Sequence, residues 1–527
     1  MSKFPPTEEQ QAILRAAREE SASLMITAYA GCGKTTTLEM LAQALPEVPS
    51  IALAFNVKIK KELEKRFPKH FEVLTLNGLG HRAWGRALGR RLEVDERKLG
   101  KLITEELRER RNGIAEAEEA WSTLKTLVTQ AMQQGLALQG PGLPKACWSG
   151  VPDTPETWVE LCRAELLDPR QHEEYIAAAR SVLGKSIKLG YAGVISFDDQ
   201  IYLPVCFGGA FPHAQQLLVD EGQDLSPLNH EQVRRVAGLD GRLFVVGDPK
   251  QAIYAFRGAD SASMTKLRSL RRGWIDLPLA TTFRCPKVVV ARQQKHAPGF
   301  TAWKTNIEGA FKQLGLLAPQ PEATAEAPQT TWNFTTLRQL GDTSSIAILC
   351  RNNAPLLSMA FKLLRQGIGV VFLGRDIGKS LVGLAKKLAP KDDTSSAEVA
   401  RAIEEWQVKE TSLAEANGNE HLVSGIIDRA ECLRAVLGSD VETAGELRST
   451  LECLFARESG LVTLSTGHRA KGLEWPVVVH LDPWRIPSKY AQRNPAQLEQ
   501  ELNLKYVIET RSQRLLLEAS LNDFEEA

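Results

Sequence analysis

With 527 residues the chain is too long to fold around one hydrophobic core, so we expect several domains. Its 65 Lys and Arg nearly balance its 64 Asp and Glu, so the total charge does not point to a polyanionic partner, although a locally basic channel fits these totals. Eight scattered cysteines, the lack of a signal peptide and the lack of a membrane-length apolar run argue against a disulfide scaffold and a membrane protein. We therefore expect a cytoplasmic, nucleoid-associated protein with reduced thiols.

The first predicted element is a capped helix that begins in Thr7–Leu14. Thr7 is the expected N-cap, and Gln10 follows three residues later. The carboxamide of Gln10 can donate to and accept from an adenine edge at once, although a surface glutamine is the more ordinary interpretation.

A strand, a phosphate-binding loop and a helix come next. Leu24–Ile26 forms an apolar run, and Gly31 and Gly33 allow successive backbone N–H groups to point at a polyphosphate at the start of a helix. Lys34 then reaches the terminal phosphates, and the Thr35 hydroxyl ligates Mg²⁺. The residues expected to hold the nucleotide are Ala30, Gly31, Cys32, Gly33, Lys34, Thr35 and Thr36. Ala28 replaces the first glycine of the usual motif, and a chance glycine-rich turn is the alternative.

Alternating strands and helices follow the loop. Ser50–Asn56 reads as a buried strand, Lys58–Phe67 as a helix, and Val73–His81 as a third strand with a polar loop. This alternation predicts a parallel sheet covered on both faces. From about Arg86 to Gly190 charged helical segments predict an inserted subdomain, whose core stripe comprises Trp121, Leu124, Val128 and Met132. Strand character returns at Val194–Asp199.

Two later strands end in residues suited to phosphate chemistry. Gln216–Val219 runs into Asp220 and Glu221, where Asp220 would hold Mg²⁺ and Glu221 would deprotonate the attacking water. An acidic loop after a core strand is the alternative. Arg242–Asp248 leads to Gln251, which is placed to sense a γ-phosphate.

Aromatic residues follow this sensor. Tyr254 and Phe256 offer flat faces on which bases can stack, although buried core aromatics are the usual explanation of such a pair.

A second half begins near Leu277, with a cation beside an aromatic ring in Thr282–Pro286. Ile346–Arg351 and Val370–Gly374 are predicted strands separated by a helix, and residues 386–459 are again helical and charged. We therefore expect an α/β protein with two parallel-sheet halves, each with a mainly helical insertion. Val462–Trp475 and Leu504–Arg511 complete the second half.

In this order the motifs resemble the UvrD/Rep/PcrA group of superfamily 1 DNA helicases, from Gln10 to Arg511. The segments Leu53-Ala-Phe-Asn56 and Thr75-Leu-Asn-Gly-Leu-Gly80 lean toward the F-box DNA helicase branch. The resemblance implies two RecA-like P-loop motor domains. We expect domain 1A at 1–90 and 194–276, with its insertion 1B at 91–193. We expect domain 2A at 277–385 and 460–527, with a short 2B-like insertion at 386–459.

The resemblance also assigns residues to ATP. Gln10 contacts adenine, Phe283 stacks on its ring, and Glu474 binds the ribose. Arg284 and Arg511 match two arginines of the second motor domain that contact the γ-phosphate, where a guanidinium stabilises the charge of phosphoryl transfer. ATP and Mg²⁺ are the implied ligands.

The implied DNA-binding residues are Phe55, Lys58, Thr75, Asn77, Tyr254, Phe256, Arg257, Thr466 and His468. Three positions depart from the family pattern. Asn77 replaces a common His, Phe256 stands where many relatives carry Trp, and Gly222 replaces an Ala between the acids. We expect weaker stacking at Phe256 and no effect at Gly222.

The resemblance implies an ATP-dependent translocase that moves 3′ to 5′ on single-stranded DNA and opens the duplex at junctions. One alternative is a translocase that strips proteins from DNA or drives a repair or anti-phage complex. Another is a P-loop switch that binds nucleotide without moving. RNA is compatible with stacking and phosphate contacts, and protein partners are open.

Overall fold

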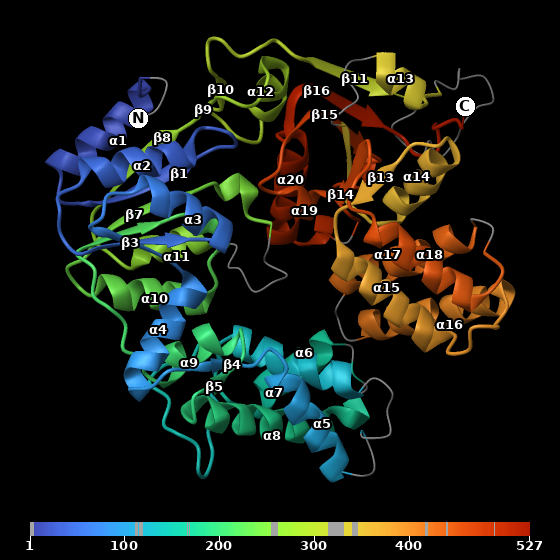
Figure 1. The fold of residues 1–527 in the computed structure, drawn as a ribbon, viewed down its shortest axis with the longest axis horizontal. Coiled ribbons are helices and arrows are strands. Elements are labelled where there is room, and N and C mark those ends of the chain that lie inside the picture. The colour runs from blue at the N-terminus through green and yellow to red at the C-terminus, as the bar shows by residue number, and fades with distance from the viewer. Residues whose placement is uncertain are drawn as a thin grey trace. The chain divides into compact units, whose positions relative to one another are not determined.

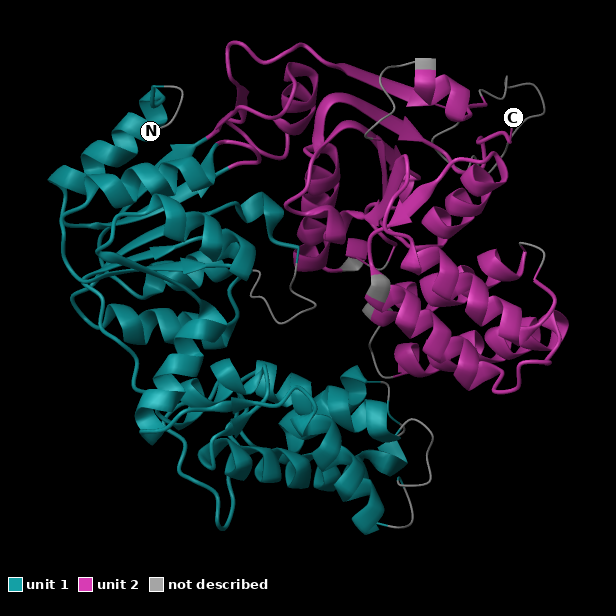
Figure 2. Ribbon diagram, in the orientation of Figure 1, with its two compact units in different colours: residues 1–28, 33–279 teal, residues 29–32, 280–527 magenta. Residues whose placement is uncertain are grey.

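The computed structural model of the chain divides into two compact units. Unit 1 comprises Met1–Ala28 and Gly33–Leu279, and unit 2 comprises Tyr29–Cys32 and Ala280–Ala527 (Figure 2). The structure describes residues 5–110, 114, 120–165, 167, 169–253, 262–314, 331–339, 346–416, 420–438, 441–489 and 491–526. Within these residues, no helix has both the length and the apolar character needed to cross a bilayer.

Unit 1 alternates helices and strands around one sheet. Its elements are α1 (Glu8–Glu19), β1 (Ser23–Ala28), α2 (Lys34–Ala44), β2 (Ser50–Ala54), α3 (Val57–Arg66), β3 (Phe71–Thr75), α4 (Leu76–Leu88), β4 (Glu93–Val94), α5 (Lys98–Arg110), α6 (Ala120–Gln133), α7 (Pro155–Ala164), α8 (His172–Tyr191), β5 (Val194–Ile195), α9 (Asp199–Phe207), β6 (Gln216–Val219), α10 (Pro227–Ala237), β7 (Arg242–Gly247), α11 (Ser263–Ser269) and β8 (Trp274–Leu279).

The sheet of unit 1 has six parallel strands in the order β3-β2-β6-β7-β1-β8 (Figure 1). Strands β2 and β6 are buried along their whole length, which explains why they read as continuous apolar runs rather than alternating ones. Because the strands are parallel, the residues that follow β1, β6 and β7 meet at one edge of the sheet. This edge carries the predicted phosphate chemistry.

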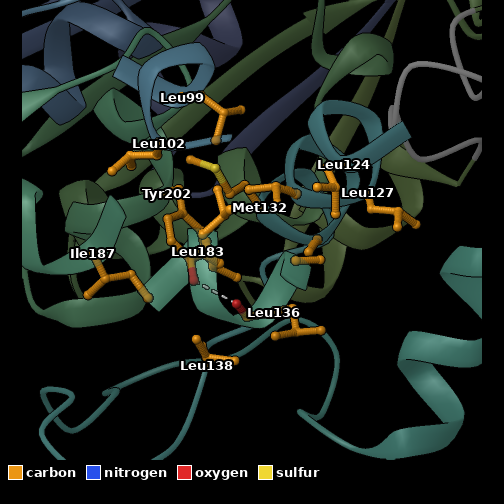
Figure 3. Close-up of a cluster of buried hydrophobic side chains, with 14 of the residues drawn as sticks. Leu99, Leu102, Leu124, Leu127, Met132, Leu136, Leu138, Leu183, Ile187 and Tyr202 are labelled. Atoms are coloured by element: carbon orange, nitrogen blue, oxygen red, sulfur yellow. Dashed lines mark hydrogen bonds between the residues drawn. The ribbon is translucent and has the colours of Figure 1, made fainter. Parts of the chain in front are cut away.

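The helical insertion of unit 1 lies between β4 and β5, which pair with each other in a separate two-stranded parallel sheet. Strand character in the predicted segment Val194–Asp199 is therefore limited to two residues outside the main sheet, because Asp199 already begins α9. The insertion has its own hydrophobic core, in which the Tyr202 hydroxyl donates to the Leu136 carbonyl at 2.7 Å (Figure 3).

The predicted stripe on α6 is correct for Leu124, Val128 and Met132, which are buried in this core. The prediction that Trp121 belongs to the core is wrong, because its side chain is 39% exposed. Its indole nitrogen donates to the Thr104 hydroxyl at 3.2 Å. The tryptophan thus packs against α5, close to Gly100, rather than filling the core.

The polar loop predicted after β3 is also wrong, because α4 begins there directly. Thr75 is the N-cap of this helix, and its hydroxyl accepts a hydrogen bond from Gly78 N at 3.0 Å. Gly80 is needed for close packing, since a Cβ there would lie 1.9 Å from the carbonyl oxygen of Gln200. The glycines therefore mark a tight contact between helices rather than a loop.

Unit 2 also contains a central sheet with helices. Its elements are β9 (Thr281–Thr282), α12 (Lys287–Gln293), β10 (Thr301–Ala302), β11 (Ala310–Leu314), α13 (Phe334–Gln339), β12 (Ile346–Cys350), α14 (Ala354–Arg365), β13 (Val370–Phe372), α15 (Arg375–Leu388), α16 (Ser396–Ala416), α17 (Glu420–Leu437), α18 (Ala444–Ala456), β14 (Val462–Thr466), α19 (Gly467–Ala470), β15 (Trp475–Leu481), α20 (Pro495–Glu509) and β16 (Ser512–Ala519).

The main sheet of unit 2 has six parallel strands in the order β11-β16-β15-β12-β14-β13. Its insertion is a bundle of α15 to α18, in which α15 packs on α18 and α16 packs on α17. The boundary expected at residue 386 falls inside α15, which begins at Arg375. The predicted fold class is confirmed, since each unit joins a parallel sheet to a mainly helical insertion.

Candidate active site

The phosphate-loop sequence connects β1 to α2. Gly33 is the N-cap of α2 with φ 78°, a left-handed conformation that glycine adopts without strain. Lys34 is the first helical residue, so its neighbours Thr35 and Thr36 lie in the first turn. The backbone N–H groups of a first turn have no partners within the helix and favour anions.

Lys34 is held against the acid that follows β6. Its Nζ lies 2.7 Å from Glu221 Oε1, and the two side chains are only 15% and 18% exposed. Glu221 adopts a left-handed φ of 50°, which is uncommon outside glycine and marks a constrained position. Its backbone N–H donates to Asp220 Oδ1 at 2.9 Å, which fixes the two acids relative to each other.

Two glutamines connect this pair to the end of β7. Gln223 Nε2 donates to Glu221 Oε2 at 2.5 Å, and its Oε1 accepts from Asp248 N at 2.9 Å. Gln251 Nε2 donates to Asp248 Oδ2 at 2.6 Å. The predicted sensor Gln251 thus belongs to the same buried network as the predicted base.

The site carries an excess of negative charge. Burial first, and the charge of Glu221 second, raise the pKa of Asp220 to about 7 although Lys34 opposes this. Burial likewise raises the pKa of Asp248 to about 6. Burial works against the charge of Lys34, but the nearby acids outweigh it and raise the pKa of Lys34. Three acids around one lysine create a site in which a further cation relieves repulsion.

Gln10 is buried rather than on the surface. It completes a capping box, since its Oε1 accepts from Thr7 N at 3.0 Å. Its Nε2 donates to Thr37 Oγ1 at 3.0 Å, and Thr37 in turn donates to Gly33 O. The glutamine is therefore tied to the helix that follows the phosphate loop.

The loop residues Tyr29–Cys32 group with unit 2, where their backbone has defined partners. Ala30 N donates to the Tyr506 hydroxyl at 2.9 Å, and Phe283 N donates to Gly31 O at 2.9 Å. A Cβ on Gly31 would lie 2.5 Å from Arg284 Cβ, so only glycine fits there. The ring of Phe283 is 43% exposed and lies 5.3 Å from that of Trp303.

The two predicted arginines of unit 2 differ in their surroundings. Arg284 forms an ion pair with Glu474, and Glu474 also accepts from Gln513 Nε2 at 2.9 Å. Arg511 is 1% exposed and donates to Val507 O, Leu473 O and Thr510 Oγ1 at 2.9, 3.2 and 3.1 Å. Arg511 is thus built into the end of α20, whereas Arg284 is held mainly by another side chain.

A pocket of about 280 Å³, lined by aromatic, aliphatic and polar side chains, lies beside the ends of β2 and β3 in unit 1. Phe55 and Phe197 line it and are exposed by 44% and 62%, and Asn77 Nδ2 donates to Phe197 O at 3.2 Å. Asp224 and Asn229 contribute polar groups. Two exposed rings beside hydrogen-bonding groups form a surface on which a base can stack.

The other predicted DNA contacts are spread over both units. Lys58 is exposed on α3, and Thr75 caps α4. In unit 2, Thr466 is the buried N-cap of α19, and His468 is partly buried in that helix. Tyr254, Phe256 and Arg257 lie outside the described residues.

Comparison with known protein families agrees with this arrangement. The sequence model of the UvrD/REP helicase N-terminal domain matches residues 212–270, which contain Asp220, Glu221 and Gln251. The model of the UvrD-like helicase C-terminal domain matches residues 427–521, which contain Glu474 and Arg511. The chain thus contains segments that match both the N-terminal and the C-terminal domain of UvrD-like helicases. Its two units therefore correspond to the two RecA-like domains of these helicases.

Individual relatives point within the family to the F-box branch. F-box DNA helicase protein 1 of Schizosaccharomyces pombe is 23% identical over 549 residues, which cover 98% of this chain and 57% of the relative. ATP-dependent DNA helicase UvrD1 of Mycobacterium tuberculosis is 25% identical over 504 residues, covering 67% of this chain and 63% of the relative. The chain thus spans about three fifths of the length of these two proteins.

The RecB subunit of the RecBCD enzyme of Mycolicibacterium smegmatis shows a stronger but shorter similarity. It is 40% identical over 126 residues, which cover 22% of this chain and 11% of RecB. The similarity therefore concerns one segment of the chain.

The structure corrects one expectation about the family motifs and adds a residue. A Cβ on Gly222 would lie 2.6 Å from Val245 Cγ1 and 3.0 Å from Met264 Sδ, so this glycine is required by its packing and is not silent. Phe197 was missed, because no motif singled it out. The sequence feature that could have identified Phe197 is an aromatic residue between a short strand and two acids in Val194–Asp199.

Proposed function

We propose that this chain is an ATP-dependent DNA helicase that translocates 3′ to 5′ on single-stranded DNA and unwinds duplex at junctions. The observation that carries the proposal is the buried network of Lys34, Asp220, Glu221 and Gln251 at one edge of a parallel sheet. The matches to UvrD-like helicase domains and the similarity to two DNA helicases support the DNA substrate, and the polarity comes from the resemblance of the motifs.

The Lys34 ion pair suggests how hydrolysis begins. When ATP binds, Lys34 turns from Glu221 to the terminal phosphates. The Glu221 carboxylate, still oriented by Gln223, is then free to accept a proton from the attacking water. Gln251 senses the γ-phosphate through the same network, and Gln10 and Phe283 bind the adenine.

The acid-rich site fits a magnesium ion. Asp220 is buried with its pKa raised by burial and by Glu221, so a divalent cation near its carboxylate would offset an existing repulsion. Thr35 and Asp220 are the residues that would hold the ion. An ion held there would help to neutralise the negative charge of the ATP phosphates.

In unit 2, we assign Arg284 and Arg511 to the γ-phosphate and Glu474 to the ribose. The ion pair between Arg284 and Glu474 holds both side chains before nucleotide binds. Arg284 must leave the Glu474 carboxylate to contact the phosphate, so ATP binding would break this ion pair.

We assign the strand-binding surface to Phe55, Asn77 and the added residue Phe197. Their pocket provides stacking faces and amide groups without a fixed hydrogen-bond code, which suits a motor that must accept any sequence. Thr466 and His468 are the proposed contacts in unit 2.

ATPase assays with and without single-stranded DNA test the proposal. We expect strong stimulation of the unmodified chain and none in Lys34→Ala. Duplexes with a 3′ or a 5′ single-stranded tail test the polarity, since only the 3′ tail should support unwinding. Equal unwinding of both substrates would contradict the polarity, and an ATPase indifferent to DNA would favour a nucleotide switch.

The RecB similarity favours a second candidate, the motor subunit of a larger complex. This candidate predicts a vigorous DNA-stimulated ATPase with weak unwinding by the isolated chain. Measuring both activities on one preparation separates it from the first.

A further inference from the structure

A buried cluster in unit 2 lies apart from the residues assigned to ATP and DNA. His480 on β15, Glu509 at the end of α20 and Glu518 on β16 are all buried. One ligand atom from each side chain lies within 4.8 Å of the others. Three elements near the end of the sequence thus bring an imidazole and two carboxylates close together.

The imidazole of His480 has no hydrogen-bond partner among the described residues, although it is 0% exposed. Neither ring nitrogen has a hydrogen-bond partner among these residues. This arrangement costs folding free energy, because a buried polar group without a partner loses its interactions with water. A neutral imidazole is a common metal ligand. One of the ring nitrogens lies within 4.8 Å of an oxygen of each carboxylate.

The carboxylates already have cationic neighbours. Arg292 contacts both acids, at 3.2 Å from Glu509 and 2.8 Å from Glu518. Gln293 Nε2 donates to Glu509 Oε2 at 2.5 Å. Lys505 is the weaker partner, since its Nζ lies 3.7 Å from both acids and its side chain is 35% exposed. Lys505 can therefore move into solvent while Arg292 stays.

We propose that His480, Glu509 and Glu518 form a binding site for a divalent transition-metal ion, in which the ion takes the place of the Lys505 ammonium. The ion supplies the missing partner of the imidazole. Replacing one ammonium by a divalent cation changes the local charge by only one unit.

The donor set indicates the class of ion. One imidazole nitrogen with two carboxylate oxygens suits Zn²⁺, Mn²⁺ or Co²⁺ better than Mg²⁺, which prefers oxygen ligands and water. Zinc lies about 2.0–2.2 Å from such donors, so the three ligand atoms must move closer together before all of them bind one ion.

A route from solvent exists. A hollow of about 590 Å³ opens on this side of unit 2, and Arg292, Lys505 and Glu509 are among its lining residues. Of the three proposed ligands, Glu509 lines the hollow, and the partly exposed Lys505 beside it is a competing cation.

The test uses the full chain with Asp220→Asn as the common background, so that the phosphate-loop region does not contribute a second ion. Chelator-treated protein without nucleotide is dialysed against Zn²⁺ or Mn²⁺, and bound metal per chain is measured by mass spectrometry. Co²⁺ is added separately, because its visible spectrum reports ligation. We expect about one ion per chain and a higher melting temperature in the loaded protein.

Three variants make the test specific. His480→Val should lose the ion without losing metal-free stability, because it removes an unpartnered polar group from a strand of valines. Lys505→Gln should bind the ion more tightly, because it removes the competing charge. His296→Gln is the control, since this histidine lines the same hollow but is bonded to Asn503 instead.

Glu518→Gln provides a second test should His480→Val fold poorly, and we expect affinity to fall by about tenfold or more. A chain that retains no ion after dialysis would overturn the proposal. So would equal binding by the parent and by His480→Val or Glu518→Gln, or weaker binding by Lys505→Gln.

Discussion

Lys34 Nζ lies 2.7 Å from Glu221 Oε1, so the proposed phosphate-binding cation and the proposed catalytic base neutralise each other. Each is largely withdrawn from solvent, which strengthens the pair. The same contact keeps the base occupied until a phosphate competes for the lysine. The ion pair therefore disfavours proton abstraction from water by Glu221 before Lys34 moves to a phosphate.

Replacing Lys34 by alanine should abolish ATP hydrolysis, with a loss of about 10²-fold or more in kcat, because a donor aimed at the reacting phosphates is removed. Nucleotide binding should weaken as well. Lys101→Ala is the control, since Lys101 is an exposed lysine paired with Asp95 in the insertion. Turnover by Lys34→Ala at the parent rate would refute the site.

The raised pKa values of Asp220 and Asp248 predict how stability depends on pH. Both acids hold their protons more tightly in the folded chain than their ordinary pKa of 3.8 implies. Their contribution to stability is therefore present below about pH 4 and is lost as the pH rises through about 6 to 7. Mg²⁺ binding should strengthen over the same range, because it requires the ionised acids.

Denaturant titrations from pH 5 to pH 8, with chelator and without nucleotide, check this prediction. Asp220→Asn should lose less stability across the range than the parent does. Asp276→Asn should keep the parent's dependence, because Arg268 lowers the pKa of the exposed Asp276 below this window. A parent-like slope in Asp220→Asn would contradict the assignment.

Local apolar patterning was enough to predict the buried strands and the strand-loop-helix unit around Lys34. It failed where a distant contact decides the outcome. The glycines of α4 looked like a loop because the approach of Gln200 to Gly80 cannot be seen in a local window. Gln10 looked like a surface residue because its partner Thr37 lies 27 positions away.

The active-site motifs identified the chemistry but not the state of the side chains. The ion pair of Arg284 with Glu474, and the burial of Arg511 among carbonyl groups, depend on tertiary packing. Phe197 was missed for a related reason, since its closeness to Phe55 and Asn77 comes from folding of the insertion's return segment.

Gly222→Ala should destabilise unit 1 by about 1–3 kcal/mol and lower ATPase activity, because the added methyl collides with Val245 on β7. Relief of the clash must displace the Asp220–Glu221 segment. Gly383→Ala on α15 is the matched control, since no atom lies within 4 Å of its Cβ position and alanine favours a helix. Thermal melting and turnover of both variants test the prediction, and an unperturbed Gly222→Ala would contradict it.

Phe197→Ala should weaken binding to single-stranded DNA by about 5- to 150-fold, which corresponds to the roughly 1–3 kcal/mol of one base stacked on an aromatic ring. Basal ATPase without DNA should change little. Leu239→Ala is the control, because this residue is the most exposed of the large apolar side chains of the described chain. Fluorescence anisotropy with a labelled oligonucleotide measures the effect, and an unaltered affinity would remove Phe197 from the binding surface.

The different surroundings of Arg284 and Arg511 predict different consequences of removing them. Arg284→Ala breaks a partly exposed pair with Glu474, so its folding cost should be below about 1 kcal/mol. Arg511→Ala leaves acceptors of α20 without their donor and opens a space in a buried region, so unit 2 should lose about 1–3 kcal/mol or more.

Both variants should reduce ATP turnover by about 10³-fold if their guanidinium groups act on the γ-phosphate. Melting curves beside kcat separate the two effects, since Arg284→Ala should fold normally and fail in catalysis while Arg511→Ala should fail in both. Arg514→Ala removes an exposed arginine of β16 and should change neither quantity. Full activity in Arg284→Ala would show that this arginine serves only to hold Glu474, and an unchanged melting temperature in Arg511→Ala would mean that its three hydrogen bonds contribute nothing to the fold.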